Sequence, residues 1–272
     1  RNPFFTEFAT SLQMALADRG YATVIANTDE SAQTQAQVVS AMIEHGVSAL
    51  IISPTYGETS AVFDAIERAD IPAMQVLRKV DTRTNRFPFA APDYVNGSRL
   101  AAKHLLEQGA EKIAFVGGLE GRDVTSERMS GFLSELKDSA VEPLIFTGQA
   151  TRHFGRKIAK HLAQEHPLCD AELCFNDLVA LGLIVGCHEL GRRIGNDLKI
   201  VGFDDIEEAS ESWPQLTSVH CGIAEFGESI AETMLAWLEE GYLPKAQIRT
   251  PVTLKIRDSS RQYANEEVSI IR

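Results

Sequence analysis

The stretch Lys112-Ile113-Ala114-Phe115-Val116-Gly117-Gly118 indicates the fold class. Its apolar residues are contiguous, so they predict a short strand that is buried on both faces. A helical pattern follows at 126–137, and a second apolar run follows at 143–146. Strands that are apolar on both faces and separated by helices are typical of parallel sheets. The stretch therefore predicts an α/β fold.

The same alternation of apolar runs and helical patterns extends in both directions along the chain. A polar stretch at 78–93, which contains proline, divides the alternation into two runs of similar length. Right-handed crossovers would wind each run into its own doubly wound parallel sheet. The helical patterns lie at 6–19, 31–45, 58–69, 94–108, 154–165 and 177–190, and the apolar runs at 21–26, 47–52, 71–77, 171–175 and 198–202.

The last third of the chain departs from this order. It contains a strand at 218–221, a long helix at 224–240 and a final strand pattern at 248–256. A chain that continues after its second run can return to the first half. We therefore predict two lobes, residues 1–91 with 222–247 and residues 92–221 with 248–272. Ligand sites occur preferentially between domains, so we expect a small-molecule site in the cleft between the lobes.

Composition excludes several classes of protein. The chain has 26 Lys and Arg against 38 Asp and Glu, a formal net charge of −12, which disfavours a nucleic-acid-binding surface. The apolar runs are far shorter than the roughly 20 residues of a membrane-spanning helix. The four cysteines form no Cys-x-x-Cys pair, and their spacing to histidine suits no zinc motif, so we predict buried thiols and no metal.

Two motifs could suggest an enzyme. Gly117-Gly118-Leu119-Glu120-Gly121 resembles a phosphate-binding loop but lacks the spacing of a nucleotide fingerprint. Asp204-Asp205 resembles a pair of catalytic carboxylates, but neighbouring residues on a strand point to opposite sides, so we expect only one of them in a site. No nucleophile elbow or metalloprotease motif is present. We therefore predict no catalytic activity and no cofactor.

Several segments together resemble the effector-binding core of the LacI-type (lactose-repressor-like) transcriptional regulators, which share the periplasmic sugar-binding-protein fold. The matching segments keep the order and spacing of that family almost from end to end. They include Asn2-Pro3-Phe4-Phe5, Gly46-Val47-Ser48-Ala49-Leu50, Glu127-Arg128-Met129-Ser130-Gly131-Phe132, Asn176-Asp177-Leu178-Val179-Ala180 and Val201-Gly202-Phe203-Asp204-Asp205.

The resemblance implies a function as well as a fold. It implies a cytoplasmic homodimeric repressor core that binds a small effector, most often a sugar, and transmits its binding to operator DNA. Family members carry a helix-turn-helix module and a hinge before the Asn-Pro-Phe-Phe segment, so we expect the native polypeptide to continue upstream of Arg1. The alternative is a periplasmic or receptor-linked sugar-binding protein of the same fold. Upstream sequence would distinguish the two.

Three polar residues follow the strands of the second run and are expected to bind the effector. Asn176 and Asp204 directly follow strands, and Arg128 lies in the helix after the Gly117-Gly118 turn. Ligands of open parallel sheets bind at the carboxyl ends of strands, and these side chains can hydrogen-bond to a polyol. The resemblance places effector contacts at the same positions. The alternative is that Arg128 and Asp204 only pair with each other.

Further candidates come from positions around the expected cleft. Phe4 and Phe5 could offer an aromatic face to a pyranose ring, although one of them could instead be a hydrophobic staple at the start of a helix. Cys221 stands where the family usually has glutamine, and Leu77-Arg78 stands where it has Asp-Arg. The remaining candidates for ligand binding are Ser53, Arg78, Asp93 and Asn96.

Overall fold

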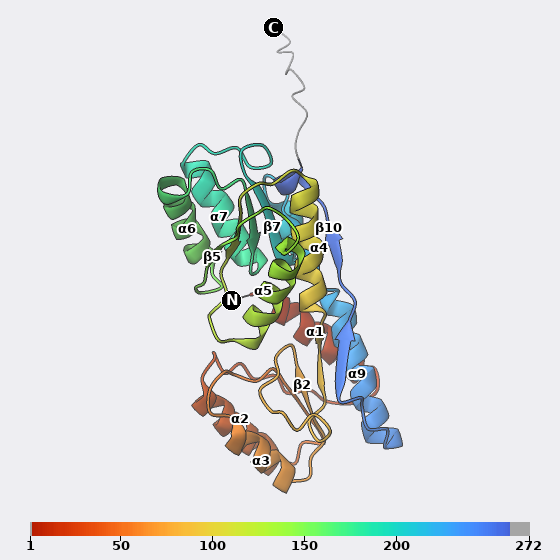
Figure 1. Cartoon of the computed structure of the whole chain (residues 1–272). Helices are drawn as coiled ribbons and strands as arrows, with labels where there is room; N and C mark the ends of the chain where they lie inside the picture. The colour runs from red at the N-terminus through yellow and green to blue at the C-terminus, as the bar shows by residue number, and fades with distance from the viewer. Residues whose placement is uncertain (1, 262–272) are drawn as a thin grey trace. The chain divides into compact units, whose positions relative to one another are not determined.

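A computed structural model describes residues 2–261 as two compact units. Unit 1 comprises residues 2–93 and 222–251, and unit 2 comprises residues 94–221 and 252–261. Each unit contains a largely parallel sheet with helices packed on it, so the predicted α/β fold is confirmed (Figure 1). Within the described residues, no helix is both long enough and apolar enough to cross a membrane.

Unit 1 is built on a four-stranded parallel sheet with the order β1-β2-β3-β9. Helices α2 and α3 pack against each other, as do α1 and α9 (Figure 1). The helices are α1 (Pro3–Ala17), α2 (Ala32–Glu44), α3 (Ser60–Arg68) and α9 (Ile223–Glu240). The strands are β1 (Leu50–Ile52), β2 (Ala73–Val76), β3 (Phe89–Pro92) and β9 (Gln247–Thr250).

Asn2 and Pro3 stabilise the start of helix α1. The side chain of Asn2 accepts a hydrogen bond from the Phe4 amide at 3.1 Å, and Pro3 occupies the first turn, where its missing N–H has no cost. Residues at intervals of four then form one buried stripe, comprising Phe4, Phe8, Leu12 and Leu16. Phe8 lies 5.5 Å from Phe226 of α9, centroid to centroid, so this stripe packs α1 onto α9.

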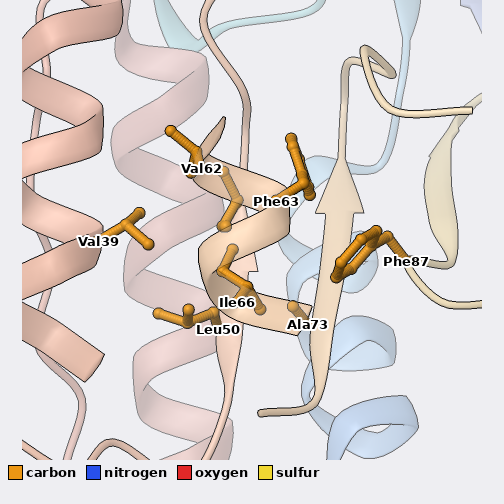
Figure 2. Packing of buried hydrophobic residues seen from close by; sticks show 8 residues of the cluster. Val39, Leu50, Val62, Phe63, Ile66, Ala73 and Phe87 are labelled. Atoms are coloured by element: carbon orange, nitrogen blue, oxygen red, sulfur yellow. The ribbon is translucent and has the colours of Figure 1, made fainter. Parts of the chain in front are cut away.

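One hydrophobic core of unit 1 lies between its helices and its sheet. Figure 2 shows that side chains from α2, from α3 and from the strands converge there. Phe63 and Phe87 pack edge to face, with centroids 5.0 Å apart. The core comprises Val39, Leu50, Ile52, Val62, Phe63, Ile66, Ala73 and Phe87.

Unit 2 is built on a six-stranded sheet with the order β10-β8-β7-β6-β4-β5, in which only β10 is antiparallel to its neighbour. The strands are β4 (Ile113–Val116), β5 (Leu144–Phe146), β6 (Ala171–Cys174), β7 (Lys199–Asp204), β8 (Thr217–His220) and β10 (Thr253–Lys255). The helices are α4 (Tyr94–Glu107), α5 (Asp123–Leu136), α6 (Arg152–Glu165), α7 (Asp177–Glu189) and α8 (Glu207–Glu211), with a short 3-10 turn at Asp258–Ser260.

Alternation along β7 places helices on both faces of this sheet. Phe203 faces α4, because a Cβ added at Gly97 of that helix would lie 2.7 Å from its ring. Gly202 faces α7, because a Cβ added there would lie 2.1 Å from the carboxylate of Asp177. Consecutive strand residues point to opposite faces, so α4 and α7 cover opposite sides, α4 with α5 beside it and α7 with α6 beside it (Figure 1).

Glycines allow α6 and α7 to approach closely. A Cβ on Gly182 of α7 would lie 1.9 Å from the carbonyl oxygen of Arg152, and a Cβ on Gly155 of α6 would lie 2.0 Å from that of Val179. Both obstacles are backbone atoms, which cannot move aside as a flexible side chain can. The two helices must therefore separate if either glycine gains a side chain.

We expect the substitution Gly182→Ala to destabilise unit 2 by about 1–3 kcal/mol, because overpacking at the backbone outweighs the better helix propensity of alanine. Urea unfolding followed by circular dichroism would measure the loss. The control is Val185→Ala, since Val185 lies on the same helix but is 49% exposed. Equal stability of both variants would contradict the packing argument.

Two strand predictions were wrong. Residues 21–26 form no strand, and Val24 and Ile25 are 72% and 55% exposed, because within the described residues no neighbouring strand pairs with this segment. The predicted strand at 248–256 is two strands in different sheets, β9 in unit 1 and β10 in unit 2. Pro251 lies between them and lacks the N–H that a continuous ladder would need.

The boundary of the second lobe also needs a correction. Residues 92–93 and 248–251 were assigned to the second lobe, but both segments belong to unit 1. Strand β9 pairs with β3, with Ile248 opposite Ala90. The chain passes into unit 2 after residue 251. Strand β3 itself lies in the stretch 78–93, which its polar composition had marked as a connection.

Candidate functional site

Arg128 and Asp204 meet at the carboxyl end of the sheet in unit 2. Arg128 donates from Nη2 to Asp204 Oδ1 at 3.1 Å and from Nη1 to the carbonyl oxygen of Phe175. The side chains of Arg128 and Asp204 are both only 4% exposed. The structure therefore contains the ion pair that the sequence offered as the alternative to a purely ligand-binding role.

Three aromatic rings surround the Arg128 guanidinium. Its central carbon lies 3.8 Å from the ring centroid of Phe203, 4.7 Å from that of Phe175 and 4.8 Å from that of Tyr94. Aromatic faces attract a cation electrostatically, and they also exclude water from it. This cage was not predicted from the sequence. The signal that could have found it is that each ring is the immediate neighbour of a candidate, Tyr94 of Asp93, Phe175 of Asn176 and Phe203 of Asp204.

Asn176 lies next to this pair and also has a structural role. Its side-chain oxygen accepts a hydrogen bond from the Val179 amide at 3.1 Å, so Asn176 is the N-cap of α7. The cap fixes the orientation of the side-chain amide at the end of β6. Asn176 lies two residues beyond the end of β6, whereas the sequence predicted that it directly follows the strand.

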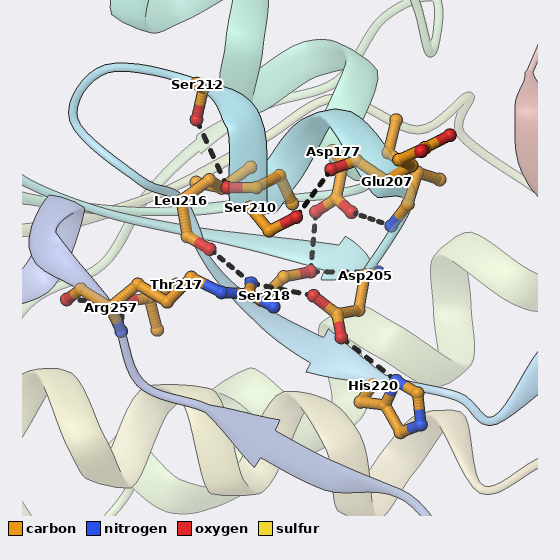
Figure 3. Close-up of polar contacts among 12 residues, drawn as sticks. Asp177, Asp205, Glu207, Ser210, Ser212, Leu216, Thr217, Ser218, His220 and Arg257 are labelled. Atoms are coloured by element: carbon orange, nitrogen blue, oxygen red, sulfur yellow. Dashed lines mark hydrogen bonds and ion pairs between the residues drawn. The ribbon is translucent and has the colours of Figure 1, made fainter.

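Asp204 and Asp205 form a turn in which both residues have positive φ, 109° and 57°. Their carboxylates point in different directions. Asp204 pairs with Arg128, whereas Asp205 pairs with His220 at 2.9 Å and with Arg257 at 2.7 Å (Figure 3). Only Asp204 therefore faces Arg128. This agrees with the prediction that the two neighbouring carboxylates point to different sides.

Asp177 and Cys221 are buried beside this turn. Burial raises the pKa of Asp177 well above its usual value, and the negative charge of Asp204 acts in the same direction. Hydrogen bonds from Ser218 and from the Ile206 amide oppose that shift in pKa. The Cys221 thiol is 2% exposed, and burial raises its pKa as well, so it is a poor nucleophile.

In unit 1, Arg78 contacts one predicted residue, Phe5, and two residues that were not predicted, Tyr56 and Glu30. Its guanidinium carbon lies 5.0 Å from the ring centroid of Tyr56 and 5.7 Å from that of Phe5, and it pairs with Glu30 at 2.7 Å. Leu77, directly before it, has a φ of 64°. Tyr56 and Glu30 were not predicted, because their approach to Arg78 depends on loops.

The other candidates lie apart from these contacts. Phe4 is 3% exposed and belongs to the apolar stripe of α1, so it is a core residue, whereas Phe5 is 37% exposed. The Ser53 carbonyl accepts from Gln35 at 3.4 Å, and Asn96 accepts from Arg99 at 2.9 Å. Asp93 ends the first passage of the chain through unit 1, where its amide donates to Thr250.

The described residues offer no metal site, since no three His, Cys, Asp or Glu side chains among residues 2–261 are arranged to hold an ion. Residues 102–260, more than half of the chain, match the family described as "Periplasmic binding protein-like domain". The chain belongs to this periplasmic binding protein-like family. The polar residues at the strand ends of unit 2 all lie within the matched range.

Other members of the family resemble the whole chain. The "Ribose operon repressor" of Halalkalibacterium halodurans is 28% identical over 98% of this chain and 78% of the relative. The "HTH-type transcriptional repressor PurR" of Vibrio atlanticus is 28% identical over 88% and 72%.

A crystal structure of a LacI family transcriptional regulator from Enterococcus faecium with bound ribose gives a TM-score of 0.87, with 24% identity over 97% of this chain and 96% of that one. These similarities confirm the resemblance to the LacI-type regulators.

Proposed function

We propose that this chain is the effector-sensing core of a LacI-type transcriptional regulator and that its effector is a small sugar. The observation that carries the proposal is the similarity to a ribose operon repressor over 98% of the chain. In this proposal the chain works in the cytoplasm as a homodimer, and a helix-turn-helix module outside residues 1–272 binds the operator. It has no catalytic role.

The chemistry of the predicted residues supports a polyol as the effector. Asp204 can accept hydrogen bonds from hydroxyl groups, and the Arg128 guanidinium has five N–H groups, of which the protein contacts described above use two. Both groups are poorly exposed, and charged hydrogen bonds are strong where water is excluded. In unit 1, Phe5 and Tyr56 would offer their faces to the apolar side of a sugar ring.

We propose the contacts of the effector separately for each unit. We keep Arg128, Asn176, Asp204 and Cys221 of unit 2 and Phe5 and Arg78 of unit 1 as its principal contacts, with Ser53, Asp93 and Asn96 around them. Phe4 is left out because it belongs to the core of unit 1. A ligand that binds one state of the core better by about 1–3 kcal/mol would change operator affinity by about 5–150-fold.

A thermal-shift screen tests the sugar proposal. The panel contains D-ribose, other monosaccharides, disaccharides, sugar acids and nucleosides. We expect a sugar to raise the melting temperature, because a ligand at 100 times its Kd adds about 2.7 kcal/mol of stability. A response to a nucleoside alone would contradict the sugar class, and no response to any compound would contradict the sensor function.

Calorimetry on variants then tests the site. We expect Asp204→Asn to weaken binding of the responding sugar by about 10–150-fold, since a charged hydrogen bond in a water-excluded site is lost. The control is Glu111→Gln, because Glu111 is exposed and precedes β4, at the opposite edge of the same sheet. Equal affinity of Asp204→Asn and the control would remove Asp204 from the site.

A further inference from the structure

The turn formed by Asp204, Asp205 and Ile206 is unusual in its backbone. Asp204 has a φ of 109° and Asp205 a φ of 57°, conformations that residues with a side chain rarely adopt and that glycine adopts without strain. Glycine would therefore be the easier residue at either position. Non-glycine residues keep such a backbone conformation only where the surrounding structure fixes them, and such residues are concentrated at ligand-binding sites.

Two buried side chains fix the backbone directly after Asp204. The Asp205 amide donates to Ser218 Oγ at 3.1 Å, and the Ile206 amide donates to Asp177 Oδ2 at 2.9 Å. Ser218 in turn donates to Asp177 Oδ1 at 2.6 Å (Figure 3). Asp177 and Ser218 are both 0% exposed. Both amides that follow Asp204 are thus held by one buried pair.

A neighbouring residue, Gly202, leaves room for the side chain of Asp177. Gly202 has an ordinary φ, but a Cβ there would lie 2.1 Å from Asp177 Oδ1, so the missing side chain makes room for the carboxylate. Asp177 is also the first residue of α7. On the other side of the turn, His220 and Arg257 hold the Asp205 carboxylate.

We propose that Asp177 and Ser218 are positioning residues of the effector site, which hold the strained turn so that the Asp204 carboxylate faces Arg128. This inference rests on the proposed function, because it assigns a purpose to the position of Asp204. Neither residue is proposed to touch the effector. They act through the two backbone amides and would set how tightly Asp204 can hold a sugar hydroxyl.

The test uses the whole chain with two variants and one matched control. Ser218→Ala removes the hydroxyl from between Asp177 and the Asp205 amide. Gly202→Ala displaces the Asp177 carboxylate by adding one methyl group. The control is Ser139→Ala, since the Ser139 hydroxyl, like that of Ser218, both donates and accepts one hydrogen bond. It donates to the Leu136 carbonyl oxygen at 2.8 Å and accepts from the Val141 amide at 3.2 Å.

The first measurement is amide hydrogen exchange, which requires no ligand. We expect exchange at Asp205 to become at least about ten-fold faster in Ser218→Ala, because its amide loses its buried acceptor. Exchange at Ile206 should also become faster, because Asp177, the acceptor of that amide, loses its hydrogen bond from Ser218. The second measurement is the Kd for D-ribose by calorimetry, which we expect to weaken by about ten-fold in the same variant. Ser139→Ala should match the wild-type chain in both measurements.

The outcomes separate this proposal from the proposed function. If Asp204→Asn weakens D-ribose binding but Ser218→Ala lowers only the unfolding midpoint, the positioning role is overturned and the site stands. If the wild-type chain does not bind D-ribose, the exchange measurement still decides whether the pair holds the turn. Exchange rates at Asp205 and Ile206 within two-fold of wild type would overturn the proposal, and Gly202→Ala must agree with Ser218→Ala wherever it folds.

Discussion

The substitution Glu172→Gln is expected to stabilise the protein strongly above neutral pH. Glu172 lies on β6 and is 0% exposed, and within the described residues neither of its carboxyl oxygens has a hydrogen-bond partner. Burial raises its pKa from 4.5 to about 8, although the nearby charge of Arg192 acts in the opposite direction. The carboxyl group is therefore neutral in the folded chain at pH 7.

The direction of the pH dependence follows from that raised pKa. Between pH 4.5 and about 8 the folded chain keeps a proton that the unfolded chain releases. The contribution of Glu172 to folding stability is therefore fully present below pH 4.5. This contribution falls as the pH rises through the window, by about 1.4 kcal/mol per pH unit. A glutamine has the same shape and does not titrate, so the variant escapes this loss.

Urea unfolding at pH 5 and pH 8 would measure the effect. We expect the difference in unfolding free energy between Glu172→Gln and wild type to grow by about 4 kcal/mol between these values. The exposed Glu111→Gln provides the control, and its difference from wild type should stay nearly constant. A similar pH dependence for Glu172→Gln and for wild type would show that the carboxyl group is ionised in the folded state.

Removing the positive charge of Arg128 is expected to have the second large effect. The variant Arg128→Met keeps an apolar side chain against Phe203 but removes the ion pair between Arg128 and the Asp204 carboxylate, which is 4% exposed. Breaking a buried ion pair from one side costs about 3–5 kcal/mol, because the remaining buried charge loses this counterion. Sugar binding should be lost in the same variant, since both groups belong to the proposed site.

A double-mutant cycle measures the interaction energy between Arg128 and Asp204. The variants are Arg128→Met, Asp204→Asn and the combination of both. Because the combination leaves no buried charge unpaired, it should be less destabilised than the sum of the single variants, by about 0.5–3 kcal/mol. Strictly additive losses, measured by the same urea unfolding, would mean that Arg128 and Asp204 do not depend on each other for stability.

The sequence predicted the positions of the central site residues because strand ends are visible in a hydrophobic pattern. Asn176 and Asp204 follow runs that are mostly apolar, and parallel strands bring such ends to one edge of a sheet. The aromatic cage of Arg128 was not predictable in this way, because Tyr94 lies in α4, Phe203 in β7 and Phe175 in the turn after β6. Their convergence exists only in the folded unit.

Backbone geometry and strand pairing depend on contacts that the sequence pattern does not encode. Aspartate at positions 204 and 205 does not indicate a positive φ as glycine would, so the turn could not be predicted from the sequence. The apolar segment 21–26 had the composition of a strand, but composition does not supply a pairing partner. The proline at 251 could have indicated that the final strand is interrupted, since proline cannot donate to a ladder.

The passage of the chain between its two units also governs when each can finish folding during synthesis. Helix α1 leaves the ribosome before α9, against which its apolar stripe packs and which follows about 200 residues later. At roughly 5–20 residues per second, the stripe waits for at least about ten seconds before its partner is made. During that interval Phe8 and Leu12 are open to chaperones and to other nascent chains. Translation speed between α1 and α9 therefore sets how long this chain depends on protection.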